Sequence, residues 1–179
     1  MRKLRNEELG RKSVKDFRKA AKLPVVIVLD NVRSFHNVGS VFRSADAFLI
    51  EGVFLCGITA KPPHRDINKT ALGATESVDW QYFRETFEAI QRLRRDNYEL
   101  VAVEQTEDSI ALDAFSPDIN KKYALVFGHE VNGVDQKVID ACDKSLEIPQ
   151  TGTKHSLNIS VSVGVVIWDF YAKLNAGIL

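Results

Sequence analysis

The feature that most limits the fold is an unbroken apolar run at positions 25–29, Val-Val-Ile-Val-Leu. A strand without alternating polar residues is typical of a parallel sheet covered on both faces. Asp30 and Asn31 end the run. Helical patterns follow it and alternate with further strand-like runs, at 52–56, 78–83, 100–103, 123–127 and 144–148. This alternation predicts an α/β fold with one parallel sheet of about six or seven strands.

The helical patterns differ in strength. Residues 86–95 are amphipathic, and we expect Phe87, Ile90 and Leu93 to form the buried face. A helix is expected to open near Val38, another to cover 135–141 with Asp135 as its N-cap, and a short helical piece to cover 69–73. The last helix should start near Ser156, and either Ser156 or Asn158 is a suitable N-cap.

The first 22 residues are strongly basic. They contain nine Lys and Arg residues against three Asp and Glu residues, a charge of +6, whereas the whole chain has a formal net charge of zero. We expect one surface helix over 6–20, with Leu9, Val14 and Phe17 as sparse apolar contacts. Such a charge asymmetry points to a nucleic-acid partner. A solvated basic helix face is the structural alternative.

Length and composition favour one ordinary domain. A chain of 179 residues can bury a substantial core, and we assign 1–22 to a basic helical extension and 23–179 to the domain. No apolar run is long enough for a transmembrane helix, and the start lacks a signal-peptide pattern. Cys56 and Cys142 have no ligand spacing, so two buried, reduced thiols in a cytoplasmic protein are expected rather than a zinc site.

Three polar loops that follow apolar strands hold the unusual residues of this chain, at 31–43, 128–134 and 149–158. Loops at the carboxyl ends of parallel strands are where open α/β sheets bind ligands. The glycine patterns of dinucleotide-binding and phosphate-binding loops are absent, and so is the G-x-S-x-G nucleophile turn. An ordinary strand–helix connection remains the alternative for any one of these loops.

Taken together, the three loops resemble the three motifs of the SpoU/TrmH branch of the SPOUT RNA methyltransferases. The matching stretches are NVGSVFR at 37–43, FGHEVNGV at 127–134, and IP at 148–149 followed by SLNISV at 156–161. The resemblance covers roughly 23–175. It implies a parallel-sheet SPOUT fold with a deep C-terminal trefoil knot, S-adenosylmethionine as methyl donor without a metal ion, and a homodimer whose active site lies near the interface.

The resemblance also assigns roles to residues. Those implied to hold the donor, mainly through main-chain hydrogen bonds and apolar contact, are Val103, Gly128, Ile148, Ser156 and Leu157. Those implied to be catalytic are Asn37, Arg43, Glu130, Ser156 and Asn158. Each catalytic assignment has a plainer alternative. Arg43 would serve as a surface ion-pair partner, Glu130 would accept main-chain N–H groups in its own loop, and Asn37 would be an N-cap.

The expected reaction is methyl transfer to a ribose 2′-hydroxyl of structured RNA. Few catalytic groups are needed, because the donor is already activated and catalysis consists mainly of positioning. Arg43 is a poor base, so we expect it to polarise the hydroxyl and stabilise the developing alkoxide. tRNA is favoured over rRNA because no large accessory RNA-binding domain is seen. An rRNA methyltransferase, a base methyltransferase and a non-catalytic RNA-binding factor on the same fold are the alternatives.

Overall fold

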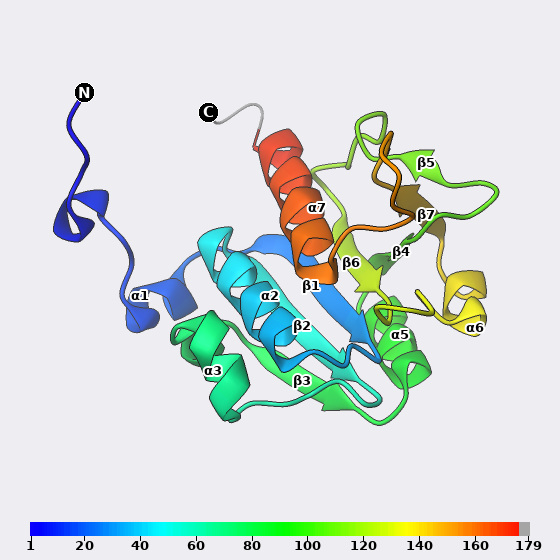
Figure 1. Ribbon diagram of the computed structural model, residues 1–179, viewed down its shortest axis with the longest axis horizontal. Helices are drawn as coiled ribbons and strands as arrows, with labels where there is room; N and C mark the ends of the chain where they lie inside the picture. The colour runs from blue at the N-terminus through cyan, green and yellow to red at the C-terminus, as the bar shows by residue number, and fades with distance from the viewer. Residues whose placement is uncertain (176–179) are drawn as a thin grey trace.

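One parallel sheet organises the computed structural model, which describes residues 1–175 (Figure 1). Within these residues the sheet has seven strands in the order β3-β2-β1-β6-β4-β7-β5. The strands are β1 (Leu23–Asp30), β2 (Ile50–Cys56), β3 (Trp80–Phe83), β4 (Tyr98–Val103), β5 (Ile110–Ala111), β6 (Lys122–Phe127) and β7 (Lys144–Glu147). The helices are η1 (Asn6–Leu9, a 3₁₀ helix), α1 (Val14–Lys19), α2 (Phe35–Ala47), α3 (Arg65–Ala71), α4 (Ala74–Ser77), α5 (Thr86–Arg95), α6 (Gln136–Asp140) and α7 (Ile159–Leu174).

The sheet is covered on both faces, as the apolar run at 25–29 predicts. In β1, Val25, Ile27 and Leu29 belong to one core cluster, whereas Val26 and Val28 belong to another. Residues of α1 to α4 and α7 complete the first cluster, and residues of α5 and α6 complete the second. Successive side chains of a strand point to opposite faces, so a strand buried in both clusters must be apolar throughout.

Helix α7 is attached to the sheet through aromatic contacts. The Phe170 ring lies 5.3 Å from the Tyr123 ring in β6 and 5.7 Å from the Phe115 ring, measured between centroids. All three side chains are buried. Edge-to-face and tilted pairs at this distance are favourable aromatic geometries. The contacts fix the last helix, and with it the loop that precedes it.

The predicted α/β class and the parallel sheet are confirmed, and α5 has the predicted bounds. The predicted buried face of α5 is wrong in one residue. Phe87 is 45% exposed, whereas Ala89, Ile90 and Leu93 are buried. The buried positions 86, 89, 90 and 93 follow helical spacing, and Phe87 lies to the side of that face. The two-residue strand β5 is too short to be recognised from sequence.

The single helix predicted over 6–20 is also wrong. The segment forms η1 and α1, separated at Gly10, whose backbone has a positive φ of 57°. Phe17 is buried against the core, and the Arg18 guanidinium donates to the Glu76 carbonyl at 2.6 Å. The residues before α1 extend away from the body (Figure 1). The basic segment therefore has an anchored part and a projecting part.

Candidate active site

A cavity of about 700 Å³ opens at the carboxyl ends of β4, β6 and β7. Because the strands are parallel and β6 and β7 both pair with β4, the loops that follow them meet at one edge of the sheet. The cavity includes seven of the residues assigned from the sequence: Val103, Gly128, Glu130, Ile148, Ser156, Leu157 and Asn158. Asn37 and Arg43 lie outside its lining.

The loop after β6 is closed by its own backbone. His129 and Gly133 exchange two hydrogen bonds, each 2.9 Å between nitrogen and oxygen. A Cβ atom added to Gly128 would overlap the carbonyl carbon of Gly133 and the amide nitrogen of Val134. Glycine at 128 is therefore required by the closed loop itself.

Glu130 joins this loop to the loop after β1. Its carboxylate accepts hydrogen bonds from the main-chain N–H groups of Arg33 and Ser34 and from the Asn37 side-chain amide, all at 3.1 Å. Partial burial raises the pKa of the Glu130 carboxyl, but these hydrogen bonds and one from its own N–H outweigh burial and hold the pKa below its ordinary value. Glu130 is thus an ionised acceptor. The main-chain N–H groups of Arg33 and Ser34, which donate to Glu130, belong to the first loop. The plainer alternative had placed all such donors in the loop of Glu130 itself.

Asn37 connects Glu130 to the third loop. The Asn158 side-chain amide donates to the Asn37 side-chain oxygen at 3.3 Å. Asn158 is the N-cap of α7, since its side-chain oxygen accepts from the Ser160 N–H at 2.9 Å. Asn37 is not an N-cap, because Ser34 has that role in α2. We call the chain of contacts Glu130–Asn37–Asn158 the polar network; it brings together all three sequence motifs.

Two of the residues with an assigned catalytic role lie outside this network. Ser156 is exposed at the cavity, and Arg43 is exposed on α2, beyond Asn37. Throughout residues 1–175, the Arg43 guanidinium makes no hydrogen bond or ion pair by the usual distance criteria, so the ion-pair alternative is not what this structure shows.

The sequence interpretation missed Glu104 and Asp30. Glu104 lines the cavity, and its carboxylate accepts from the Val134 N–H at 3.0 Å and the Gln105 N–H at 2.9 Å. Asp30 is buried and accepts from the Asp135 N–H at 3.1 Å. Each carboxylate comes at the end of a buried strand, which is the signal that could have identified it. Both fix the position of the loop after β6.

No three His, Cys, Asp or Glu side chains gather as a metal site would require among the described residues. In the same part of the chain, no helix has the length and apolar character needed to cross a membrane.

The sheet, the cavity at its carboxyl edge and the polar network define an α/β protein with a candidate ligand site among three loops. Residues 24–168 match the model of the SpoU rRNA Methylase family, and the chain belongs to that family. The predicted membership of the SpoU/TrmH branch is confirmed.

Relatives and solved structures agree with this assignment. A Staphylococcus saprophyticus protein whose name places it among TrmH family tRNA/rRNA methyltransferases is 28% identical over 154 residues, covering 86% of this chain and 61% of that protein. The chain thus spans less than two thirds of that relative.

An AdoMet-bound rRNA methyltransferase from Sinorhizobium meliloti matches with a TM-score of 0.78 and 23% identity, over 91% of this chain and 60% of that one. A structure described as giving insights into the 2-OH methylation of C/U34 on tRNA matches with a TM-score of 0.75 and 23% identity, over 86% and 99%. These matches confirm the predicted SPOUT fold class. The deep trefoil knot stays a prediction.

Proposed function

We propose that this chain is an S-adenosylmethionine-dependent methyltransferase that modifies a ribose 2′-hydroxyl of structured RNA. The polar network beside the cavity carries the proposal, because it places the three family motifs around one space. tRNA is the favoured substrate, since the chain matches 99% of the structure described for 2-OH methylation of tRNA. An rRNA substrate is the alternative, and the family description mentions rRNA.

The cavity suits the proposed donor in size and chemistry. Its volume of about 700 Å³ lies in the range of small-molecule sites, roughly 300–1,000 Å³. Val103, Ile148 and Leu157 supply apolar walls for a flat base, and the loop at Gly128 supplies main-chain groups. When bound, S-adenosylmethionine would supply an activated methyl group. The chain need only hold the donor and align the acceptor oxygen.

In this proposal the residues with catalytic roles either act on the acceptor ribose or position the residues that do. Arg43 polarises the ribose hydroxyl and stabilises negative charge that develops on its oxygen. Ser156 and Asn158 orient the reacting groups at the cavity rim. Glu130, which already accepts three hydrogen bonds from the first loop, serves as a positioning residue for Asn37.

Product analysis tests the reaction. Purified protein is incubated with labelled donor and separate tRNA and rRNA pools, and the modified nucleosides are mapped. We expect a 2′-O-methylated nucleoside from the tRNA pool. A methyl group on a base contradicts the assigned acceptor, and RNA binding without transfer by a chain that binds the donor identifies a non-catalytic RNA-binding factor.

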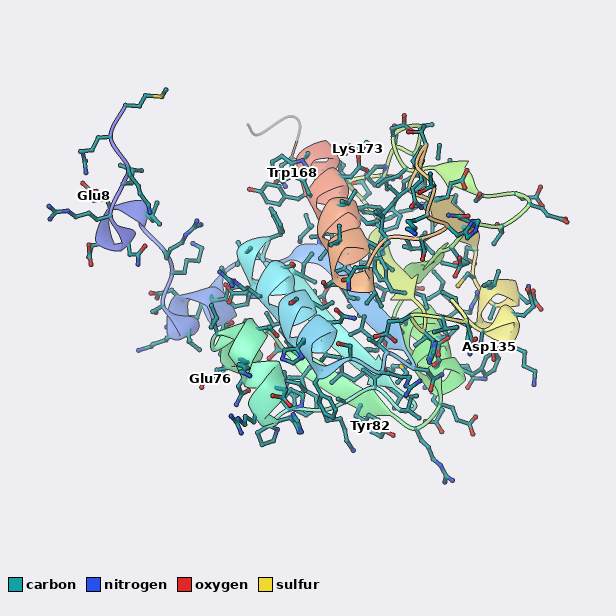
Figure 2. All side chains as sticks on the ribbon, in the orientation of Figure 1. Glu8, Glu76, Tyr82, Asp135, Trp168 and Lys173 are labelled. Carbon is teal, nitrogen blue, oxygen red and sulfur yellow. The ribbon has the colours of Figure 1, made fainter. Side chains whose placement is uncertain are left out.

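We also propose that the protein is cytoplasmic and forms a homodimer. Val161, Val165 and Trp168 lie at i, i+4 and i+7 along α7 and are 50%, 39% and 55% exposed, so one stripe of this apolar helix is left uncovered by residues 1–175. Trp168 is labelled on α7 in Figure 2. A second copy would cover the stripe. Sedimentation at several protein concentrations should give the mass of a dimer, and a persistent monomer contradicts this assignment.

Removal of residues 1–12 should weaken RNA binding without affecting donor binding. These residues include five Lys and Arg residues against two Glu residues, and they project from the body. The truncation stops before Ser13, because Ser13 caps α1 and Phe17 is buried in the core. The slope of log affinity against log salt should become shallower by about 0.7–0.9 for each phosphate that the truncated protein no longer neutralises.

Filter binding of unfractionated tRNA between low and moderate salt measures this slope, and calorimetry with S-adenosylmethionine provides the control. An unchanged affinity and slope would remove the RNA-binding role of the projecting part.

A further inference from the structure

A partly exposed aromatic stack lies at the start of α2. The Phe35 ring and the His64 imidazole are 3.9 Å apart between centroids, with 22° between their planes. Phe35 comes from the first helical position of α2, and His64 from the loop between β2 and α3. Phe35 is 38% exposed although it is a large apolar side chain. The Phe35 side of the stack is therefore open to solvent, whereas His64 is half-buried.

Hydrogen bonds fix the backbone segments that carry both rings. His64 is the N-cap of α3, and its Nδ1 accepts from the Asp66 N–H at 3.2 Å. Ser34, directly before Phe35, caps α2 and donates its N–H to Glu130. The Thr70 hydroxyl donates to the His36 carbonyl at 2.9 Å, which joins α3 to the start of α2. A preorganised stack loses little conformational entropy when a ligand binds.

The stack and the polar network share the first turn of α2. Phe35 lies between Ser34, whose N–H is bound by Glu130, and Asn37, which contacts both Glu130 and Asn158. An RNA strand whose ribose reached the polar network would therefore run beside the turn of α2 that carries Phe35.

The surroundings of the stack are basic. Arg33, Lys61, Arg65 and Lys69 are exposed. Lys61 lies over the Tyr82 ring, with its Nζ 3.9 Å from the ring centroid, and Figure 2 labels Tyr82 on β3. Residues 57–70 contain three Lys and Arg residues against one Asp, whereas 23–179 as a whole has a formal charge of −6. This local excess of positive charge complements a phosphate backbone.

We propose that Phe35 and His64 form a stacking platform for an unpaired base of the RNA substrate, with phosphates beside that base held by Lys61 and Arg65. This stacking platform rests on the proposed function and deepens it. It implies that the RNA beside the methylated ribose is single-stranded. Aromatic platforms flanked by cations are how proteins hold single strands without reading their sequence. A protein partner would need a wider apolar surface than this stack with its ring of cations.

Replacing Phe35 tests the platform. Base–aromatic stacking is worth about 1–3 kcal/mol per base, so Phe35→Ala should weaken binding of unfractionated tRNA by roughly 5- to 150-fold. The salt slope of binding should not change, because every cation that faces a phosphate is kept. Phe35→Trp, which keeps a flat ring, should bind within a few-fold of wild type. Lys61→Ala should instead make the slope shallower by about 0.7.

Phe87→Ala is the matched control. Phe87 is also a partly exposed phenylalanine, but it lies on α5, which packs in the other core cluster. Its replacement should leave RNA affinity unchanged. A thermal melt of each variant verifies folding, and calorimetry with S-adenosylmethionine verifies the donor cavity.

The outcomes separate the platform from the enzyme. If the wild type methylates RNA while Phe35→Ala binds tRNA as tightly as Phe87→Ala, the platform is wrong and the proposed function stands. If Phe35→Ala lowers both the salt slope and the affinity, the variant has lost phosphate contacts rather than base stacking, and the platform is again wrong. If the folded wild type binds neither donor nor tRNA, the proposed function itself fails.

Discussion

Arg43→Ala is expected to lower methyl transfer to the ribose 2′-hydroxyl by about 100- to 1,000-fold, the usual effect of removing one preorganised donor to a developing oxyanion. A neutral hydroxyl is a weak nucleophile, and its oxygen gains negative charge as it attacks the methyl group. A guanidinium on a helix can stabilise that charge. The structure places Arg43 on α2 outside the cavity proposed for the donor, so donor affinity should stay within a few-fold of wild type.

Single-turnover rates with saturating donor and RNA measure methyl transfer, and calorimetry measures the affinity for the donor. Arg43→Lys should restore little, because an ammonium lacks the planar fork of guanidinium donors. Arg92→Ala is the matched control, since Arg92 is an exposed arginine on α5 that pairs with Asp96 one helical turn away. A near wild-type rate for Arg43→Ala would make Arg43 a surface residue and the proposed mechanism wrong.

Gly128→Ala is expected to weaken binding of S-adenosylmethionine by about 100-fold. The added Cβ would overlap the backbone of Gly133 and Val134, which cannot move aside as a flexible side chain would. Overpacking typically costs about 1–3 kcal/mol. The overlap lies within the loop closed by His129 and Gly133, which lines the cavity, so this loop must shift. The effect arises within the protein and does not require a clash with the donor.

Gly152→Ala provides the control for this variant. Gly152 lies in the loop between β7 and α7, and a Cβ added there meets no atom of the described residues within 4 Å. It should bind the donor within about twofold of wild type. Calorimetry with the donor and with its demethylated product compares the two variants, after circular dichroism has shown that both are folded. Wild-type affinity in Gly128→Ala would mean that the loop tolerates the overlap.

Much of the fold follows from local sequence properties. The apolar run at 25–29 predicts a strand buried on both faces, and the structure shows its alternate side chains in two core clusters. The periodicity of 86–95 predicts α5 with its correct bounds, since burial of one face requires apolar residues at helical spacing. The grouping of polar loops at one edge follows from the parallel sheet.

Only the tertiary structure decided which polar groups meet. The carboxylate of Glu130 accepts from Arg33, which lies 97 positions earlier in the chain, and Asn37 contacts Asn158 across 121 positions. Hydrogen bonds depend on distances of about 3 Å and on direction, and no periodicity encodes contacts between segments so far apart. The same reason explains why the stack of Phe35 on His64 could not be foreseen. The sequence alone determined the layers and the motifs, whereas the packing of the strands determined the network that joins the motifs.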